Sequence, residues 1–217
     1  MKKLLIILVV ASTVVGLILT SFPLGRNTSY NPAPETNPPA EEIAAKHRPA
    51  LKSDVLIIEG AEETKQFSLI YDDTLRLSTY IPQDMIAEAG DSEKGHFLTV
   101  STNYNGAKNE NAMIQLFLPA DTRTTMEQLK SSTQQELEAK GFRIVTNEGM
   151  PQKYDFSEIE FDIQKGSGKN AIDGTVSIFE HNSMLYQMTI QCPSDFQEGL
   201  MARLNKMLLD IAWYDEE

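Results

Sequence analysis

The pattern of apolar and polar residues predicts a chain rich in β-strands from about residue 53 onward. In residues 75–81 every second side chain is apolar or a threonine, and the side chains between them are polar or aromatic. A period of two residues is typical of a strand with one buried face. Such patterns lead us to expect strands at residues 67–71, 75–81, 96–104, 113–118, 142–146, 159–163, 175–180 and 184–191, and either an edge strand or a packing segment at residues 54–59. The polar, glycine-containing residues 83–94 predict a long loop.

Two segments have the longer period of an amphipathic helix. The first begins at the capping box Thr124-x-x-Glu127 and ends before Gly141. The second begins at Ser194 or Asp195, either of which is a suitable N-cap. The apolar faces consist of Met126, Leu129, Thr133 and Leu137 in the first helix and of Phe196, Leu200, Leu204, Met207, Leu208 and Ile211 in the second.

The order of these elements predicts the fold class α+β. The economical assembly is one antiparallel sheet of five to seven strands with both helices packed on one side. We therefore expect a single domain over residues 53–217, preceded by an N-terminal transmembrane or signal helix. No internal repeat interrupts this plan.

The N-terminal segment has the composition of a membrane anchor. Lys2 and Lys3 precede Leu4–Gly25, which carries no charge and as a helix would span about 33 Å, enough for a hydrocarbon core of about 30 Å. The predicted anchor residues are Leu4, Leu5, Ile6, Ile7, Leu8, Val9, Val10, Val14, Val15, Leu17, Ile18 and Leu19. A cleaved signal peptide over residues 1–26 is the alternative, although no good cleavage site follows the apolar run.

Composition separates this anchor from the rest of the chain. The two lysines should stay in the cytoplasm, which predicts a single-pass protein of the bacterial inner membrane with an extracytoplasmic domain, or a secreted or periplasmic protein if the signal is cleaved. Residues 27–52 contain five prolines and little to bury, as expected of a flexible tether. The whole chain has a net charge of −12, and the part beyond residue 26 has −15. Such an acidic chain offers no footprint for nucleic acid.

Three stretches resemble the PsbP-like fold family, and the DcrB-like periplasmic proteins most of all. They are LSTYIPQDM at residues 77–85, the strand and capped helix of residues 112–149, and the apolar strand and last helix of residues 183–211. The resemblance implies an α/β sandwich that serves as a binding or assembly module. Members of the family attach to the lumenal face of a photosystem, bind a small GTPase in nuclear import, or belong to the bacterial envelope. Unlike DcrB-like lipoproteins, this chain has no cysteine after its apolar run.

Residues with catalytic or metal-binding potential are scattered. The three histidines, His47, His96 and His181, have no metal-ligand spacing, and we expect each to be hydrogen-bonded or exposed. The single cysteine, Cys192, precedes a proline and predicts a buried, inert thiol. Gly166-Ser167-Gly168 is typical of a hairpin loop.

The sequence also contains three short acidic clusters. Residues 72–73, 91–93 and 215–217 predict solvated acidic turns rather than calcium loops. We therefore assign no catalytic, metal or cofactor-binding residues and expect no cofactor. Trp213 and Tyr214 most simply pack the last helix onto the sheet, and they are also the candidate contacts for a partner.

Two functions remain open at this stage. The first is a non-catalytic, membrane-tethered, extracytoplasmic module of the bacterial envelope that binds or assembles with another protein. The second is a periplasmic protein that binds a small ligand or a divalent cation in a cleft between sheet and helices. An enzyme whose residues converge only in the folded chain is a third, weaker alternative.

Overall fold

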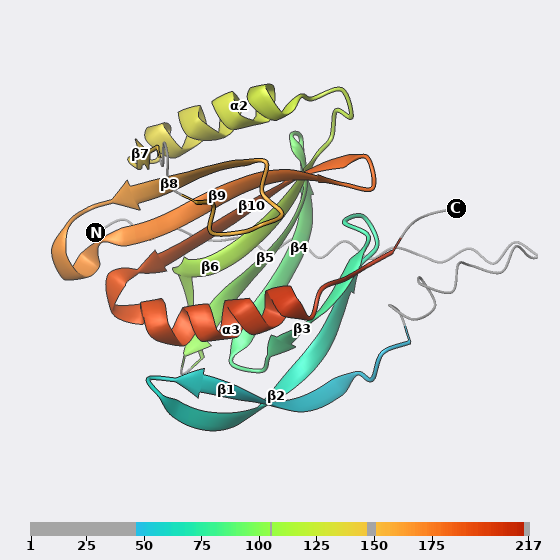
Figure 1. Cartoon of the computed structure of the whole chain (residues 1–217), viewed down its shortest axis with the longest axis vertical. Coiled ribbons are helices and arrows are strands. Elements are labelled where there is room, and N and C mark those ends of the chain that lie inside the picture. Colours follow the sequence, from blue (N-terminus) through green and yellow to red (C-terminus); the bar gives the residue numbers. More distant parts are fainter. Residues whose placement is uncertain (1–46, 105, 147–150, 215–217) are drawn as a thin grey trace, which may run out of the picture. The chain divides into compact units, whose positions relative to one another are not determined.

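Two tight turns with positive φ angles close the most regular hairpins. Glu59 and Gly60 have φ angles of 52° and 78°, and Asn182 and Ser183 have φ angles of 48° and 61°. This geometry is that of a type I′ turn, whose twist matches that of paired strands. The computed structural model describes residues 47–104, 106–146 and 151–214, with eleven strands and two α-helices among them (Figure 1).

The strands form two antiparallel sheets rather than the single sheet that we expected. The smaller sheet has the order β1-β2-β3-β11. Its strands are β1 (Leu51–Ile58), β2 (Ala61–Asp72), β3 (Leu77–Pro82) and β11 (Ala212–Trp213). The larger sheet has the order β4-β5-β6-β10-β9-β8-β7. Its strands are β4 (Met85–Ser92), β5 (Gly95–Tyr104), β6 (Ala107–Pro119), β7 (Arg143–Val145), β8 (Ile159–Lys165), β9 (Ile172–His181) and β10 (Met184–Pro193).

The helices α2 (Met126–Ala139) and α3 (Gln197–Leu209) lie on opposite faces of the larger sheet. Neighbouring residues of a strand point to opposite faces. On β10, Gln187 accepts a hydrogen bond from Thr133 of α2, whereas Met188 is buried with Leu204 of α3. The fold is therefore α+β and mostly antiparallel, as expected, but the placement of both helices on one side was wrong.

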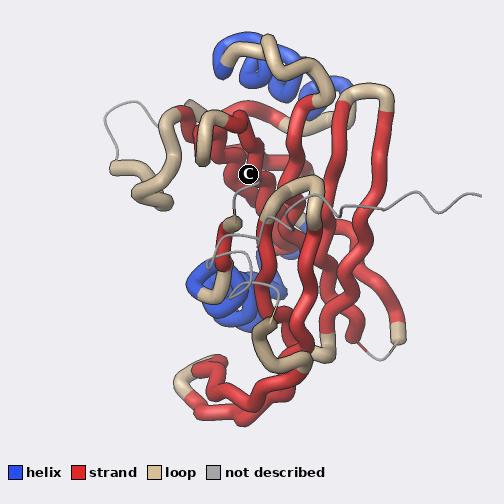
Figure 2. Tube along the Cα trace, turned by 90° about the vertical axis from the view of Figure 1, so that its right-hand side faces the viewer, coloured by secondary structure: helices blue, strands red, loops and turns tan. Residues whose placement is uncertain are grey.

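Helix α3 packs against both sheets. It contacts β1 and β3 of the smaller sheet and β6 and β10 of the larger one, and Figure 2 shows it beside the strands in the lower half of the domain. Leu200, Leu204 and Met207 are at most 2% exposed within the largest buried cluster. A second cluster buries Leu129 and Leu137 of α2 against β8 and β9. Both faces of the larger sheet are apolar, and each is therefore packed against one of the two helices.

Four local predictions were wrong. Residues 85–92 form β4, not a loop, because β5 pairs with them along their whole length. The capping box of α2 is Thr125-x-x-Gln128, one residue later than predicted. Ser194 belongs to the 3₁₀ turn η2 (Ser194–Phe196), so α3 begins without a side-chain cap. Phe196 is 39% exposed instead of buried.

The domain begins earlier than expected. Arg48 donates a hydrogen bond to the Asp210 carbonyl at 2.9 Å, and Tyr80 donates one to the Pro49 carbonyl at 2.7 Å. The last residues of the predicted tether are therefore part of the fold. The predicted anchor residues and residues 27–46 lie outside the described residues. Within the described ranges, no helix is both long enough and apolar enough to span a bilayer.

Candidate functional site

A groove of about 900 Å³ lies between α2 and the strands β5, β6 and β10. We call it the α2 groove. Helix α2 packs against β7, β8 and β9, so the neighbouring strands β6 and β5 extend beyond its edge. The lining comes mainly from the inward face of α2, the loop before it, and the strand residues on the same face of the sheet.

The floor of the α2 groove is made of uncharged side chains. On this floor, Gln115 of β6 and Thr189 of β10 are cross-strand neighbours. Gln115 is also paired with Thr99 of β5, which does not itself line the groove. The Gln115 amide donates to Thr99 Oγ1 at 2.9 Å. On β10, the Gln187 amide donates to Thr189 Oγ1 at 3.1 Å and accepts from Thr133 of α2. These bonds fix the orientation of both amides while leaving each amide with further donor and acceptor capacity.

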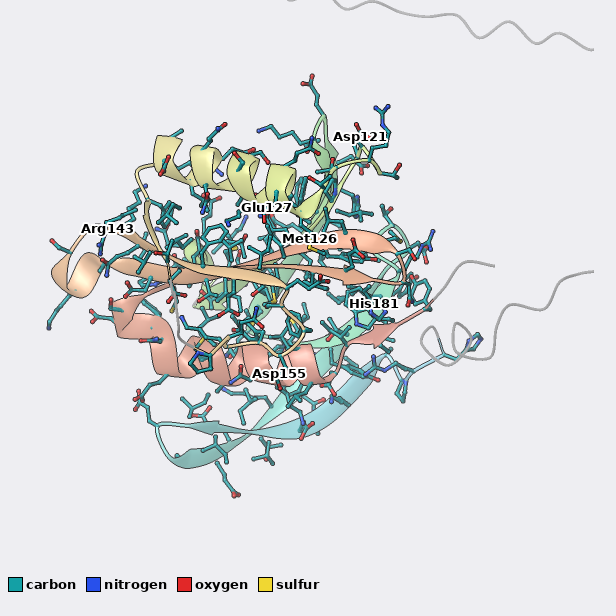
Figure 3. All side chains as sticks on the ribbon, turned by 45° about the horizontal axis from the view of Figure 1, so that its top comes forward. Asp121, Met126, Glu127, Arg143, Asp155 and His181 are labelled. Atoms are coloured by element: carbon teal, nitrogen blue, oxygen red, sulfur yellow. The ribbon has the colours of Figure 1, made fainter. Side chains whose placement is uncertain are left out.

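The charged side chains that line the α2 groove come from the β4–β5 turn, the loop before α2, and α2 with its C-cap, and none comes from β5, β6 or β10. Lys94, in the turn between β4 and β5, forms an ion pair with Glu136 of α2, and the two side chains are 67% and 42% exposed. Asp121 lies in the loop that leads into α2 (Figure 3). His181, which does not line this groove, lies at the β9–β10 turn (Figure 3). Gly90 packs against the ring of Phe97, since an added Cβ would be 3.0 Å from the ring.

A second site surrounds Trp213, which the sequence had marked as a candidate partner contact. The indole lies 4.4 Å from the imidazole of His181 and 5.1 Å from the ring of Tyr186, measured between ring centroids. Phe179 joins this cluster, and Phe156 packs on Phe179 with centroids 4.9 Å apart while remaining 45% exposed. A pocket of about 180 Å³, the Trp213 pocket, is lined by Leu116, Phe156, Phe179, Glu180, His181, Met188, Leu208, Ile211 and Trp213.

Tyr214, the other candidate contact, is a buried, hydrogen-bonded side chain. It is 3% exposed, and its hydroxyl donates to the Asp72 carbonyl at 3.1 Å and to Asp73 at 2.9 Å. A side chain that is so buried and bonded fixes the C-terminal strand to the β2–β3 turn. The structure thus keeps Trp213 beside a pocket and places Tyr214 in the interior.

His96 lies between two carboxylates. Its Nε2 is 2.8 Å from Asp72 and its Nδ1 is 2.7 Å from Asp91. Burial alone would lower the pKa of His96, but the hydrogen bonds and charges of Asp72 and then Asp91 raise it above its ordinary value. Asp72 also accepts hydrogen bonds from the amides of Thr74 and Leu75, and it is 7% exposed. The prediction of a solvated acidic turn was therefore wrong for Asp72.

Two other predicted features, Cys192 and the glycine-containing loop, lie where the sequence suggested. Cys192 is 5% exposed, and burial, followed by the charge of Asp173, raises the pKa of its thiol to about 11. Gly166 and Gly168 lie in the loop between β8 and β9. Across the described ranges, no group of three or more His, Cys, Asp or Glu side chains is placed to hold a metal ion.

The sequence suggested a cleft between sheet and helices but did not identify the residues that line the α2 groove, for a specific reason. Its floor is the second face of strands whose first face is buried against α3, and both faces are rich in uncharged residues. A usable signal was present in Gln187, Thr189 and Gln191, three polar residues at alternate positions of an otherwise apolar strand. Such a row indicates a sheet face that is only partly covered.

No protein-family model matches the chain, and no curated protein matches it either.

Proposed function

We propose that this chain is a non-catalytic, membrane-tethered, extracytoplasmic module of the bacterial envelope that binds another protein. The observation that carries the proposal is the Trp213 pocket, a small hollow lined mainly by apolar side chains, among them the exposed ring of Phe156. Protein interfaces are enriched in aromatic side chains, and their strongest contacts are anchors that fill such pockets.

The aromatic cluster is suited to a contact because it is already rigid. Trp213 is held between His181, Phe179 and Tyr186, and Tyr186 donates a hydrogen bond to the Leu75 carbonyl at 3.0 Å. A partner side chain entering the Trp213 pocket would therefore order few groups on this side of the interface, which lowers the entropic cost of binding.

The sequence supports the proposed location. The apolar segment Leu4–Gly25, the proline-rich residues that follow it and the resemblance to DcrB-like proteins all favour an envelope protein on a tether. The charge of −15 beyond residue 26 would be repelled by an anionic bilayer, which favours a domain held away from the lipid surface.

Photocrosslinking tests the proposal directly. We would place p-benzoylphenylalanine at Phe156 of the full chain in intact cells and identify the adducts by mass spectrometry. A discrete adduct with an envelope protein is expected at this position, and Trp213→Ala should abolish it. The same probe at Lys130, on α2 and 37% exposed, is the control. Adducts that are equal at both positions, or that persist in Trp213→Ala, would overturn the proposal.

The α2 groove favours a second function, the binding of a small ligand. Its volume of about 900 Å³ falls in the usual range of ligand sites, which are lined mostly by apolar groups with a few placed polar ones. Differential scanning fluorimetry of the full chain against periplasmic metabolites and divalent cations tests this function, because a ligand that binds the folded state raises the melting temperature. A temperature that no compound changes would reject it.

A further inference from the structure

The floor of the α2 groove excludes charged ligands. Its strand residues Gln115, Gln187 and Thr189 carry no charge, and the charged lining residues come from the β4–β5 turn, the loop before α2, and α2 with its C-cap. A carboxylate or an ammonium placed on this floor would lose its hydration without gaining a counter-charge. The occupant must therefore be neutral where it lies over the strands.

The same floor excludes a purely aliphatic occupant. Gln187, Thr189 and Thr133 are already at most 8% exposed. Covering the remaining amide capacity of Gln115 and Gln187 with a hydrocarbon chain would leave buried donors and acceptors unpaired, which costs about 1–3 kcal/mol for each group. A suitable occupant must present donors and acceptors on neutral groups and also apolar surface for Phe97 and Phe117.

The spacing of the polar groups selects among such occupants. Gln187, Thr189 and Gln191 are successive residues on one face of β10, so they are separated by about 6.8 Å, twice the rise of a strand residue. An extended polypeptide has the same two-residue repeat. Each of its peptide groups carries one donor and one acceptor, which are the complements of a glutamine side chain.

We propose that the α2 groove binds an uncharged polypeptide segment in an extended conformation, lying along β6 and β10 beneath α2. The inference rests on the proposed protein-binding function and specifies the kind of segment that a partner would supply. Small side chains of the segment would contact Phe97 and Phe117, while its peptide groups would bond to Gln115 and Gln187. This surface is separate from the Trp213 pocket, because the two share no lining residue.

A peptide-binding experiment tests the inference. The full chain, in phosphatidylcholine nanodiscs, would be screened by fluorescence anisotropy against dye-labelled, end-blocked peptides built from Gly, Ala, Val, Ser, Thr, Asn and Gln. We expect members of this pool to bind, and central Asp or Lys substitutions in the peptide to abolish binding. Gln115→Leu should weaken binding about five- to tenfold, the value of one lost hydrogen bond.

A matched pair of tryptophan variants shows whether binding occurs in the groove. Ser132 lines it, whereas the adjacent, exposed Ser131 does not. Ser132→Trp should abolish peptide binding and Ser131→Trp should preserve it, and the melting temperature of each variant reports on folding. Equal binding by the two variants, no binding by any peptide, or binding of glucose oligomers or palmitate in place of peptides would overturn the inference. The crosslinking test detects adducts at Phe156, which does not line the α2 groove, so the two tests can fail independently.

Discussion

At the scale of single residues, Arg203 carries a charged group that is buried and held by several hydrogen bonds. Arg203 lies on α3 and is 5% exposed. It donates to both carboxylate oxygens of Asp84, at 3.1 Å and 2.6 Å, and to the Gly199 carbonyl at 2.7 Å. Burial alone would raise the pKa of Asp84, but the hydrogen bonds and charge of Arg203 lower it. The pair joins α3 to the turn between β3 and β4.

Removing the acidic partner should destabilise the domain. Asp84→Asn removes the carboxylate charge that pairs with the buried guanidinium of Arg203, and we expect a loss of about 3 kcal/mol in the free energy of unfolding. Urea unfolding followed by the fluorescence of Trp213, the only tryptophan, measures this loss. Lys130→Gln, which removes an exposed contact of 3.8 Å to Glu127, is the control and should be neutral. Equal midpoints for both variants would contradict the prediction.

His96 should make stability depend on pH. Because the pKa of His96 is raised above 6.5 in the folded chain, its contribution is complete below that value and is lost as the pH rises through the folded pKa. The difference in unfolding free energy between the wild type and His96→Gln should therefore shrink from about pH 5.5 to about pH 8.5. Urea unfolding across this range measures it. A difference that stays constant or grows would show that the imidazolium does not hold Asp72 and Asp91.

At the scale of elements, the start of α2 shows how closely a sequence can define a boundary and still allow two answers. Thr124-x-x-Glu127 and Thr125-x-x-Gln128 both fit a capping box. The structure uses the second, with the Thr125 amide donating to Gln128 Oε1 at 2.9 Å. The amide of Thr124 instead donates to the Asp121 carbonyl at 3.0 Å, within the preceding turn. A contact outside the helix therefore decides the boundary.

Two alanine substitutions distinguish these boxes. Thr125→Ala removes the hydroxyl that accepts a hydrogen bond from the backbone amide of Gln128, and we expect a cost of about 1 kcal/mol in unfolding free energy. Thr124→Ala should cost much less, because its side chain is not the cap. Urea midpoints of the two variants give the comparison. An equal or larger effect at Thr124 would show that the helix begins one residue earlier.

The sequence predicted elements better than their partners. Most strands and both helices follow from apolar periodicity, since that pattern reflects which side chains are buried. Residues 85–92 were missed because MIAEAGDS contains glycine and acidic residues that disfavour strands, while β5 supplies the pairing that overrides this preference. Periodicity also shows that an element has an apolar face, but it does not show which element covers that face. It therefore could not predict that α2 and α3 lie on opposite faces of the larger sheet.

The candidate site was predictable only in part. Trp213 could be singled out because a lone tryptophan near a chain end has few roles, but its stacking on His181 depends on a turn more than thirty positions away. The α2 groove depends on where α2 stops covering the sheet, and the alternating polar residues of β10 indicate a partly covered face without locating that edge. Arg203 was also missed, because an arginine on an amphipathic helix is ordinarily exposed.

At the scale of the whole domain, the β1–β2 hairpin is held less firmly than the larger sheet. The larger sheet is centred on β10, which pairs with β6 and β9. The β1–β2 hairpin lies at the edge of the smaller sheet and carries exposed Val55 and Ile57. Ion pairs help to hold it to α3: Lys206 lies 2.6 Å from Asp54, and Lys52 lies 2.6 Å from Asp210. We therefore expect the hairpin to open before the larger sheet does.

Hydrogen–deuterium exchange of the full chain measures this order. Amides of β10 should exchange slowest and those of β1 fastest among the strands. The hydrogen bond of Lys206 is the main reason why the pKa of Asp54 falls to about 2. Lys206→Gln should accordingly speed exchange in β1 about two- to fivefold, the effect of one exposed ion pair, and leave β10 unchanged. High salt should reproduce this change in the wild type by screening the pair. Exchange that rises equally in β1 and β10 would show instead that the two sheets open as one cooperative unit.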